Sequence, residues 1–329
     1  MATISVVIPV YNGERTIAET VNSVLEQTFQ DFELIVIDDG SHDATTEILA
    51  AIDDPRLKVF SYPNAGVAVS RNRGIELASG EFVSFLDADD LWTRDKLEMQ
   101  LNALRDHPEA AVSYSWTTVI DEMGIRTDYG IYPTLNGYVF PDLLELFFLG
   151  NGSNALVRSS VFDQIEGFDQ TVAPAEDWDL FLRLAANFDF VAVPKAHILY
   201  RVVSSSLSSN VLLQEKQMLK VIERAYSQEP GKSLQDLRKK SYANMYLYLA
   251  ARLLRETSSR ENGKLAARLL WLSIMNDAKI LKQTTLVSIL IFKIATALSL
   301  SPKNSLAIRE SVKSLLQRSS KTALDDRNR

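Results

Sequence analysis

The chain has 329 residues, no cysteine, a formal net charge of −7 and 46% hydrophobic residues. This length favours two domains over one, and the hydrophobic share is that of an ordinary globular protein. The absence of cysteine excludes disulfides and thiolate metal sites, and it fits a reducing compartment. The segment Met1–Val10 lacks a basic stretch and breaks at a proline, so we expect a first strand there and not a signal peptide.

Charge is unevenly distributed along the chain. Residues 1–209 carry 13 basic and 32 acidic side chains, a balance of −19, whereas residues 210–329 carry 22 basic and 10 acidic ones, a balance of +12. An acidic front and a basic tail indicate two parts with different roles. Two interpretations of the tail are equally open: solvated helices rich in Lys and Arg, or a surface that faces an anionic membrane leaflet.

Strands and helices alternate through the first hundred residues. Apolar runs predict strands at Ile4–Val10, Phe32–Ile37, Leu57–Tyr62 and Glu81–Leu86. Helical spacing of apolar residues predicts helices over Glu14–Gln27, Asp43–Ile52, Val67–Ala78 and Thr93–His107. This alternation predicts an α/β fold with a mostly parallel, Rossmann-like sheet flanked by helices and joined by right-handed crossovers.

The pattern loosens beyond His107. Strands are predicted at Ala111–Ile120, Phe190–Val193 and Ile198–Arg201, and a helix begins at Glu176. Asp121–Pro141 is predicted to be rich in turns, and Gly150–Asn154 to be a flexible polar loop. Ser204–Asn210 is Ser-rich and is predicted to be a mobile loop that marks a domain boundary.

Residues 211–320 are predicted to be helical throughout. Apolar residues recur at three- and four-residue spacing in Tyr242–Arg255 and Lys264–Leu281. Thr285–Leu300 is very apolar but short, with Lys293 at its centre. Because a spanning helix needs about 20 apolar residues, we expect a core helix or one that lies in a membrane interface.

The strand that ends at Leu86 runs directly into Asp87, Asp89 and Asp90. Like charges at the end of a buried strand repel one another, and a divalent cation offsets that repulsion. Mg²⁺ and Mn²⁺ prefer oxygen ligands and usually lie between one or two carboxylates and a substrate phosphate. Polar clusters also follow the first two strands, and ligands of parallel sheets bind beyond the carboxyl ends of the strands. The sequence therefore predicts a metal and phosphate site at this edge.

Several motifs occur in a fixed order: Val7–Glu14, Ile37–Thr45, Ser70–Ile75, Gly80–Asp90, Glu166–Asp169 and Glu176–Asp179. Over residues 3–209 the chain resembles the family 2 glycosyltransferases; the tail lies outside the resemblance. The resemblance implies a GT-A fold in which residues 1–107 bind the nucleotide and residues 108–209 bind the acceptor. The helical basic region expected at 210–329 rests on its apolar spacing and its charge. It also implies transfer of a sugar from a nucleotide diphosphate, with inversion at the anomeric carbon and a divalent metal, Mn²⁺ or Mg²⁺.

By resemblance, Pro9, Tyr11 and Glu14 line the nucleotide pocket, and Asp39 accepts a hydrogen bond from the base, most naturally an N–H of uracil. Alternatives stay open. Tyr11 can be an ordinary core aromatic with a wet hydroxyl, and Asp38 and Asp39 can be turn and cap residues.

The family resemblance also assigns roles to Asp87 and Asp89, which follow the fourth strand, and to Arg71, which precedes it. Asp89 is the expected metal ligand, and Asp87 reaches the ribose or the metal. Arg71 is expected to contact the nucleotide or a phosphate, with a local ion pair as the competing interpretation. Asp90 is the best candidate for a structural role, because a turn and a helix cap need only one acid.

Asp177 is the expected catalytic base, since transfer to a hydroxyl needs a group that takes the proton; such a base is worth roughly 10²–10⁴-fold in rate. Glu176 is explained equally well as a dipole-favoured acid in a first helical turn. Glu176, Trp178 and Arg201 are expected near the acceptor or the donor sugar, although packing is slightly favoured for Trp178. Many relatives carry Tyr-Arg-x-His where this chain has Tyr200-Arg201-Val202-Val203, which leaves a loop contact to the metal and diphosphate in doubt.

The predicted function is therefore an inverting, metal-dependent glycosyltransferase of the hexosyltransferase class. A UDP-sugar is the leading donor, and GDP- and dTDP-sugars are alternatives; the expected acceptor is a glycan or lipid-linked saccharide at the cytoplasmic membrane face, with no nucleic acid as partner. A nicotinamide-dependent oxidoreductase is disfavoured, because no glycine-rich fingerprint follows the first strand. A non-catalytic nucleotide-sugar-binding or scaffold protein remains the other candidate.

Overall fold

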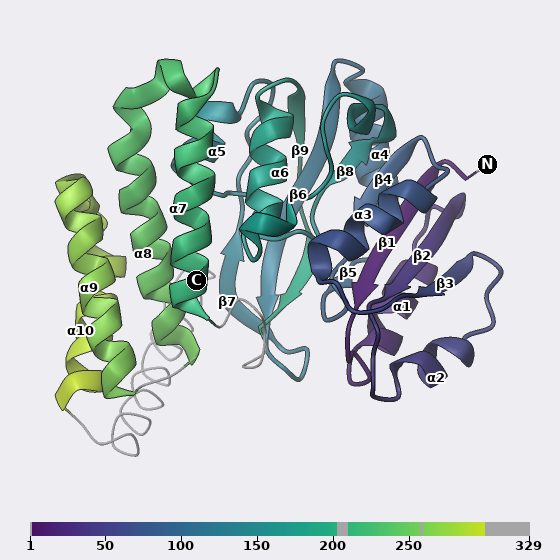
Figure 1. Ribbon diagram of the computed structural model, residues 1–329, viewed down its shortest axis with the longest axis horizontal. Helices are drawn as coiled ribbons and strands as arrows, with labels where there is room; N and C mark the ends of the chain where they lie inside the picture. The colour runs from purple at the N-terminus through teal and green to yellow at the C-terminus, as the bar shows by residue number, and fades with distance from the viewer. Residues whose placement is uncertain (1, 203–209, 257–258, 300–329) are drawn as a thin grey trace, which may run out of the picture. The chain divides into compact units, whose positions relative to one another are not determined.

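The computed structural model describes residues 2–202, 210–256 and 259–299. The chain divides into two compact units, Met1–Arg238 and Lys239–Arg329. The first unit holds every strand of the described part and the second holds helices alone (Figure 1). The Ser-rich loop expected at 204–210 lies almost entirely outside the described residues.

The first half of the sheet is parallel. β1 (Ile4–Val10) pairs with β2 (Phe32–Asp38) on one side and β4 (Phe82–Phe85) on the other, and β3 (Leu57–Ser61) pairs with β2. Every residue of β1 and β2 is buried, which explains why both strands are near-continuous apolar runs. The crossovers run through α1 (Ile17–Leu25), α2 (Thr45–Ala50) and α3 (Val67–Leu77). The strands and helices predicted for this half are confirmed.

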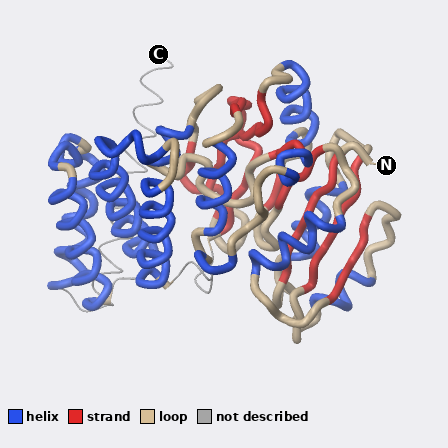
Figure 2. The backbone as a smooth tube through the Cα atoms, turned by 45° about the horizontal axis from the view of Figure 1, so that its top comes forward, coloured by secondary structure: helices blue, strands red, loops and turns tan. Residues whose placement is uncertain are grey.

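The second half of the sheet is mixed. β8 (Leu156–Arg158) runs antiparallel to β4, and β6 (Ala110–Ile120) lies between β8 and β9 (Asp189–Arg201). β5 (Leu91–Trp92) pairs with β9 and β7 (Arg126–Ile131) with β6. In the described residues this gives one nine-stranded sheet in the order β3-β2-β1-β4-β8-β6-β9-β5, with β7 beside β6. The strands of the sheet are red in Figure 2.

Helices cover both faces of this sheet. α1, α2 and α4 (Lys96–Asp106) share one core with the side chains of β1 at Ile4, Val6 and Ile8. α3 lies on the opposite face, where a Cβ at Gly74 would lie 2.2 Å from the Val7 side chain; only glycine permits this approach. The remaining helices of the unit are α5 (Phe140–Glu145), α6 (Glu176–Ala185), α7 (Val211–Ser227) and the short turns η1 (Ser159–Asp163), η2 (Gln170–Val172) and η4 (Gly231–Leu237).

Three predictions for residues 121–201 need correction. The turn-rich stretch contains the strand β7. The two short strands predicted at 190–193 and 198–201 are one strand, β9, whose register with β6 shifts around Pro194; proline and the exposed Lys195 interrupt the apolar pattern without ending the strand. The loop at 150–154 is not a flexible surface loop, because Asn151, Ser153 and Asn154 are buried and hydrogen-bonded.

The second unit contains α8 (Arg238–Glu256), α9 (Arg260–Asn276), η5 (Ala278–Lys282) and α10 (Thr284–Ser299). The predicted helical character is confirmed over the described residues; 300–320 lie outside them. α10 packs on α9, and a Cβ at Gly263 would lie 2.9 Å from Ala297. Within the ranges described, no helix combines the length and the apolar character needed to cross a bilayer.

Candidate active site

The loops after β1 and β2 are joined at the carboxyl edge of the sheet. Tyr11 is 50% exposed and meets His42 edge to face, with 6.4 Å between the ring centroids. The Glu14 carboxylate accepts the N–H of Ala44 at 3.1 Å. Pro9 is buried within β1. Tyr11 and Glu14 therefore lie on the accessible edge of the sheet, and Pro9 lies beneath it.

Asp39 already has backbone partners. Its carboxylate accepts the N–H of Ala65 at 2.9 Å and that of Gly66 at 2.7 Å, and Arg73 lies 3.4 Å away. These bonds fix the turn that begins α3, as a cap residue does. Each carboxylate oxygen can accept a second hydrogen bond, so a further N–H donor remains chemically compatible with this position.

The acidic loop after β4 is held from behind by hydroxyl groups. Ala88 O accepts hydrogen bonds from Thr16 at 2.8 Å and Thr20 at 2.9 Å. The N–H of Asp87 donates to Ser153 Oγ at 3.0 Å, and the Ser153 hydroxyl in turn donates to Asp90 Oδ2 at 2.6 Å. The loop is thus fixed before any ligand arrives.

Asp90 and Arg201 complete this support. Asp90 is fully buried, and its second oxygen accepts the N–H of Arg201 at 2.8 Å. The Arg201 side chain donates to the carbonyl of Asp89 at 2.8 Å and pairs with Glu19 at 2.7 Å. Both side chains hold the loop and leave Asp87 and Asp89 as its outward acids.

Arg71 joins the two halves of the first unit. Its side chain is almost fully buried, with Nη2 2.6 Å from Asp87 and Nη1 2.8 Å from Glu176, which is 105 residues further along the chain. The guanidinium also lies 5.0 Å from the centre of the Phe168 ring. The structure therefore brings Asp87 and Glu176 together, and the local ion pair is the contact that Arg71 makes.

The pKa values of the surrounding acids rise. Burial, followed by the charge of Glu176, raises the pKa of Asp177 to about 7. Burial and the charge of Asp87 raise the pKa of Asp89 to about 6. Burial and the neighbouring acids also raise the pKa of Asp90 well above its usual value. Among the described residues, Arg71 is the only cation that forms an ion pair with a member of the acidic cluster Asp87, Asp89, Glu176 and Asp177, so this cluster carries surplus negative charge.

The acidic cluster fits a divalent cation shared with a phosphate. Among the described residues no three His, Asp or Glu side chains are arranged to hold a metal ion by themselves. Mg²⁺ and Mn²⁺ commonly use one or two carboxylates and complete their coordination with phosphate and water. Asp87 and Asp89 supply two carboxylates of this kind. Asp87 pairs with Arg71, whereas Asp89 forms no ion pair with any described residue, so the two acids together keep negative charge that favours a cation.

Trp178 is separated from the accessible edge. Its indole is buried, its Nε1 donates to the carbonyl of Leu143 at 2.9 Å, and its ring stacks with Phe147 at 6.3 Å. His197 is buried too, and burial lowers its pKa to about 4. Both side chains lie in the protein core.

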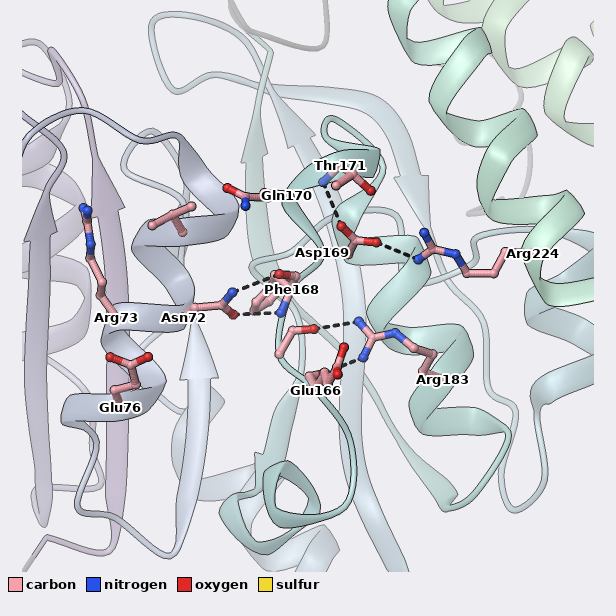
Figure 3. A pocket seen from close by; sticks show the side chains of 12 residues that line it. Asn72, Arg73, Glu76, Glu166, Phe168, Asp169, Gln170, Thr171, Arg183 and Arg224 are labelled. Carbon is pink, nitrogen blue, oxygen red and sulfur yellow. Dashed lines mark hydrogen bonds and ion pairs between the residues drawn. The ribbon is translucent and has the colours of Figure 1, made fainter. Parts of the chain in front are cut away.

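A second group of charged residues lines a groove of about 660 Å³ between α3 and the segment 166–171 (Figure 3). Arg183 pairs with Asp179 at 2.9 Å and donates to the carbonyl of Gly167 at 2.7 Å. Arg224 pairs with Asp169 at 2.7 Å. Asn72 exchanges two hydrogen bonds with the backbone of Phe168. The motifs Ser70–Ile75 and Glu166–Asp169 contribute to this groove, but the sequence did not predict it, because Arg183 and Arg224 come from other segments and belong to no motif.

The chain belongs to a known family. The model of the family described as "Glycosyltransferase like family 2" matches residues 5–253. Among curated relatives, the UDP-Glc:alpha-D-GlcNAc-diphosphoundecaprenol beta-1,3-glucosyltransferase WfgD of Escherichia coli is 31% identical over 230 residues, 67% of this chain and 85% of that protein. The putative teichuronic acid biosynthesis glycosyltransferase TuaG of Bacillus subtilis is 32% identical over 211 residues, 63% and 82% of the two chains.

Other relatives are longer. An uncharacterized glycosyltransferase of Rickettsia conorii is 33% identical over 193 residues, 58% of this chain, and the match spans 32% of its length. The chain thus matches about a third of that relative.

Solved structures share the fold. TarS of S. aureus in complex with UDP-GlcNAc superimposes with a TM-score of 0.56 at 20% identity, over 86% of this chain and 92% of that one. The mannosyltransferase PcManGT of Pyrobaculum calidifontis was solved with GDP-Man and Mn²⁺. It superimposes with a TM-score of 0.57 at 17% identity, over 95% of this chain and 80% of that one. The expected GT-A-type α/β fold with a helical C-terminal region is confirmed.

Proposed function

We propose that this protein is an inverting glycosyltransferase of the hexosyltransferase class that moves a sugar from a nucleotide diphosphate to a saccharide hydroxyl. The observation that carries the proposal is that one buried arginine, Arg71, pairs with Asp87 in the acidic loop after β4 and with Glu176, the residue before Asp177, at the carboxyl edge of the sheet. A UDP-sugar is the favoured donor, because WfgD is named for UDP-Glc and TarS was solved with UDP-GlcNAc. GDP- and dTDP-sugars are alternatives.

The donor side of the site is formed by the edge after β1, β2 and β4. Pro9, Tyr11 and Glu14 are proposed to border the nucleoside, and Asp39 to receive an N–H of the base. Asp87 and Asp89 would hold Mn²⁺ or Mg²⁺, and PcManGT, which was solved with Mn²⁺, supports this choice. The ion would neutralise the charge that grows on the departing diphosphate.

Asp177 is proposed as the general base. As the acceptor oxygen forms its bond to the anomeric carbon, the bond from that carbon to the diphosphate oxygen breaks, and the acceptor proton passes to the Asp177 carboxylate. Displacement from the opposite side inverts the anomeric configuration. A carboxylate with a pKa of about 7 accepts a proton more readily near neutral pH than an ordinary aspartate does.

The other residues expected near the sugars receive indirect roles in this proposal. Trp178 and Arg201 are buried and hold α6 and the acidic loop, so they shape the sugar-binding side from behind. Glu176 adjoins Asp177 and contacts Arg71.

The proposed acceptor is a glycan or a lipid-linked saccharide, since WfgD is named for a diphosphoundecaprenol acceptor. An enzyme that works on a lipid-linked acceptor benefits from attachment to an anionic membrane surface. In the second unit, residues 239–329 carry 17 basic and 6 acidic side chains, a balance of +11. α10 exposes Leu286, Ile289 and Phe292, at three-residue spacing, to 37%, 40% and 44%. This combination of basic charge and exposed apolar side chains suits an interfacial helix.

Membrane attachment is tested with vesicles of anionic and of neutral phospholipids. Changing Ile289 and Phe292 together to Glu should reduce co-sedimentation with anionic vesicles at least about tenfold, because apolar burial and attraction to lipid are both lost. Leu213 on α7 is 39% exposed, a fraction close to those of Ile289 and Phe292, and Leu213→Glu serves as the matched control. Unchanged sedimentation of the double variant would contradict the membrane role.

Catalysis is tested with Asp177→Asn. This variant should lose at least about 10²-fold in the rate of UDP release with acceptor present and should bind UDP and Mn²⁺ as the wild type does. Asp163→Asn on η1 is a control that should change neither quantity. A wild type that releases no UDP with any acceptor, while still binding UDP-sugars, would favour the nucleotide-sugar-binding or scaffold alternative.

A further inference from the structure

The two ion pairs of Arg71 connect parts of the site that belong to different reactants. Asp87 follows β4 on the donor side, and Glu176 directly precedes the proposed base at the start of α6. Apart from Arg71, no described residue forms an ion pair with either carboxylate. Arg71 on α3 is thus a bridge between the metal-binding edge and the helix that carries Asp177.

The surroundings of Arg71 leave little room for a direct contact with a nucleotide. The side chain is 4% exposed and both of its terminal nitrogens are paired. Phe168 covers it at 5.0 Å, and a Cβ at Gly152 would lie 2.7 Å from Nη2. A nucleotide oxygen could reach the guanidinium only by displacing Asp87 or the chain at Gly152.

The bridge is not arranged for stability alone. Burying ions is costly, and such pairs stabilise a fold only when every remaining donor and acceptor is satisfied. Arg71 Nε and Glu176 Oε2 form no hydrogen bond with any residue that the structure describes. Buried polar groups without a protein partner are rare, and a catalytic role is one of the reasons for which they occur.

We infer that Arg71 and Glu176 are positioning residues that couple the donor side to the base, in contrast to the nucleotide contact expected for Arg71 from the sequence. The planar guanidinium holds two carboxylates at fixed angles, which a lysine ammonium does not do. Asp177 follows Glu176 in the chain, so the bridge sets the place of the base relative to Asp87. Transfer depends steeply on such placement, because the reacting atoms must already lie near their bonding distance. The inference rests on the proposed function.

The test separates binding from turnover in Arg71→Lys and Glu176→Gln. Calorimetry gives the Kd for UDP with Mn²⁺, and UDP release with acceptor gives kcat. Both variants should keep Kd within about threefold of wild type and lose about 10- to 100-fold in kcat, because only the geometry of the transition state is affected. Thermal unfolding shows whether each variant is folded. Arg105→Lys, at an exposed position on α4, is the control and should keep its kcat.

The double variant gives the decisive comparison. If Arg71 and Glu176 act as one unit, Arg71→Lys combined with Glu176→Gln should lose no more kcat than the worse single variant, within about threefold. If the kcat loss of the double variant were instead the product of the losses of the two single variants, the coupling would be overturned. A tenfold or greater rise in the UDP Kd of Arg71→Lys with unchanged kcat would restore the nucleotide contact and overturn the inference alone. An inactive wild type would instead overturn the proposed function, and the inference with it.

Discussion

Two clusters of charged residues in the first unit differ in how completely their charges are paired. In the groove of Figure 3, Arg224 pairs with Asp169. Arg183 and Arg224 also both pair with the buried Asp179. In the acidic cluster, Arg71 pairs with Asp87 and Glu176, while Asp89 and Asp177 form no ion pair with any described residue. Both clusters join distant segments, but only the second leaves negative charge unbalanced.

The pKa values follow this difference. Burial raises the pKa of Asp169, yet hydrogen bonds from Thr171 and Arg224 outweigh it and the pKa falls below its usual value. Burial and neighbouring carboxylates raise the pKa of Asp177 to about 7 and that of Asp89 to about 6. Surplus charge, and not the number of charged residues, therefore distinguishes the proposed cation site from the paired network.

The largest expected effect is on metal-dependent binding. Asp89→Ala removes one of the two outward carboxylates, so Mn²⁺ should no longer strengthen UDP binding; we expect a loss of at least about 10²-fold in that enhancement. Calorimetric titration of UDP with and without Mn²⁺ measures it. Asp163→Ala is the control: Asp163 lies on η1, in a pocket shared with Glu81. This variant should leave the effect of Mn²⁺ on UDP binding unchanged. If Mn²⁺ strengthened UDP binding by Asp89→Ala as much as it does for the wild type, the metal site would be contradicted.

An intermediate effect is expected on the pH dependence of turnover. Asp177 acts only when deprotonated, and its pKa is raised to about 7, so kcat should fall about tenfold for each pH unit below that value. Arg71 lowers this pKa, whereas Glu176 and Asp87 raise it. Glu176→Gln should therefore move the acidic limb of the kcat profile to lower pH. An acidic limb that stays in place would exclude Asp177 as the titrating group.

The parallel half of the fold was predictable because its central strands are buried on both faces. A near-continuous apolar run indicates a strand without any knowledge of its partners, and β2 is the run at Phe32–Ile37 extended by Asp38. β9 was harder to predict, because Pro194 and the exposed Lys195 interrupt its apolar pattern while backbone pairing with β6 continues across a shifted register. Within the described residues β7 pairs with β6 alone, and its short sequence carries no comparable apolar run.

The candidate site was predictable where chemistry coincides with the end of a strand. Asp87 and Asp89 come just after β4, so one stretch of sequence shows both the apolar strand and the acids at its end. Ser153 and Thr20 were not predicted, because a serine or threonine that holds a loop has no distinguishing motif. The bridge from Arg71 to Glu176 joins residues 105 positions apart, which pattern and spacing do not relate.

The smallest expected effect tests the paired cluster. Arg224→Gln removes the pairs with Asp169 and Asp179, but Arg224 is 37% exposed and solvent weakens both pairs, so the free energy of unfolding should fall by about 1 kcal/mol. Because Arg183 still holds Asp179, kcat and the Kd for UDP should stay within about twofold of wild type. Chemical denaturation measures the first quantity, and Lys220→Gln on the same helix controls for loss of a surface charge. A tenfold loss of turnover without a change in stability would mean that the groove, with its balanced charges, belongs to the active site, and charge pairing would no longer separate the two clusters.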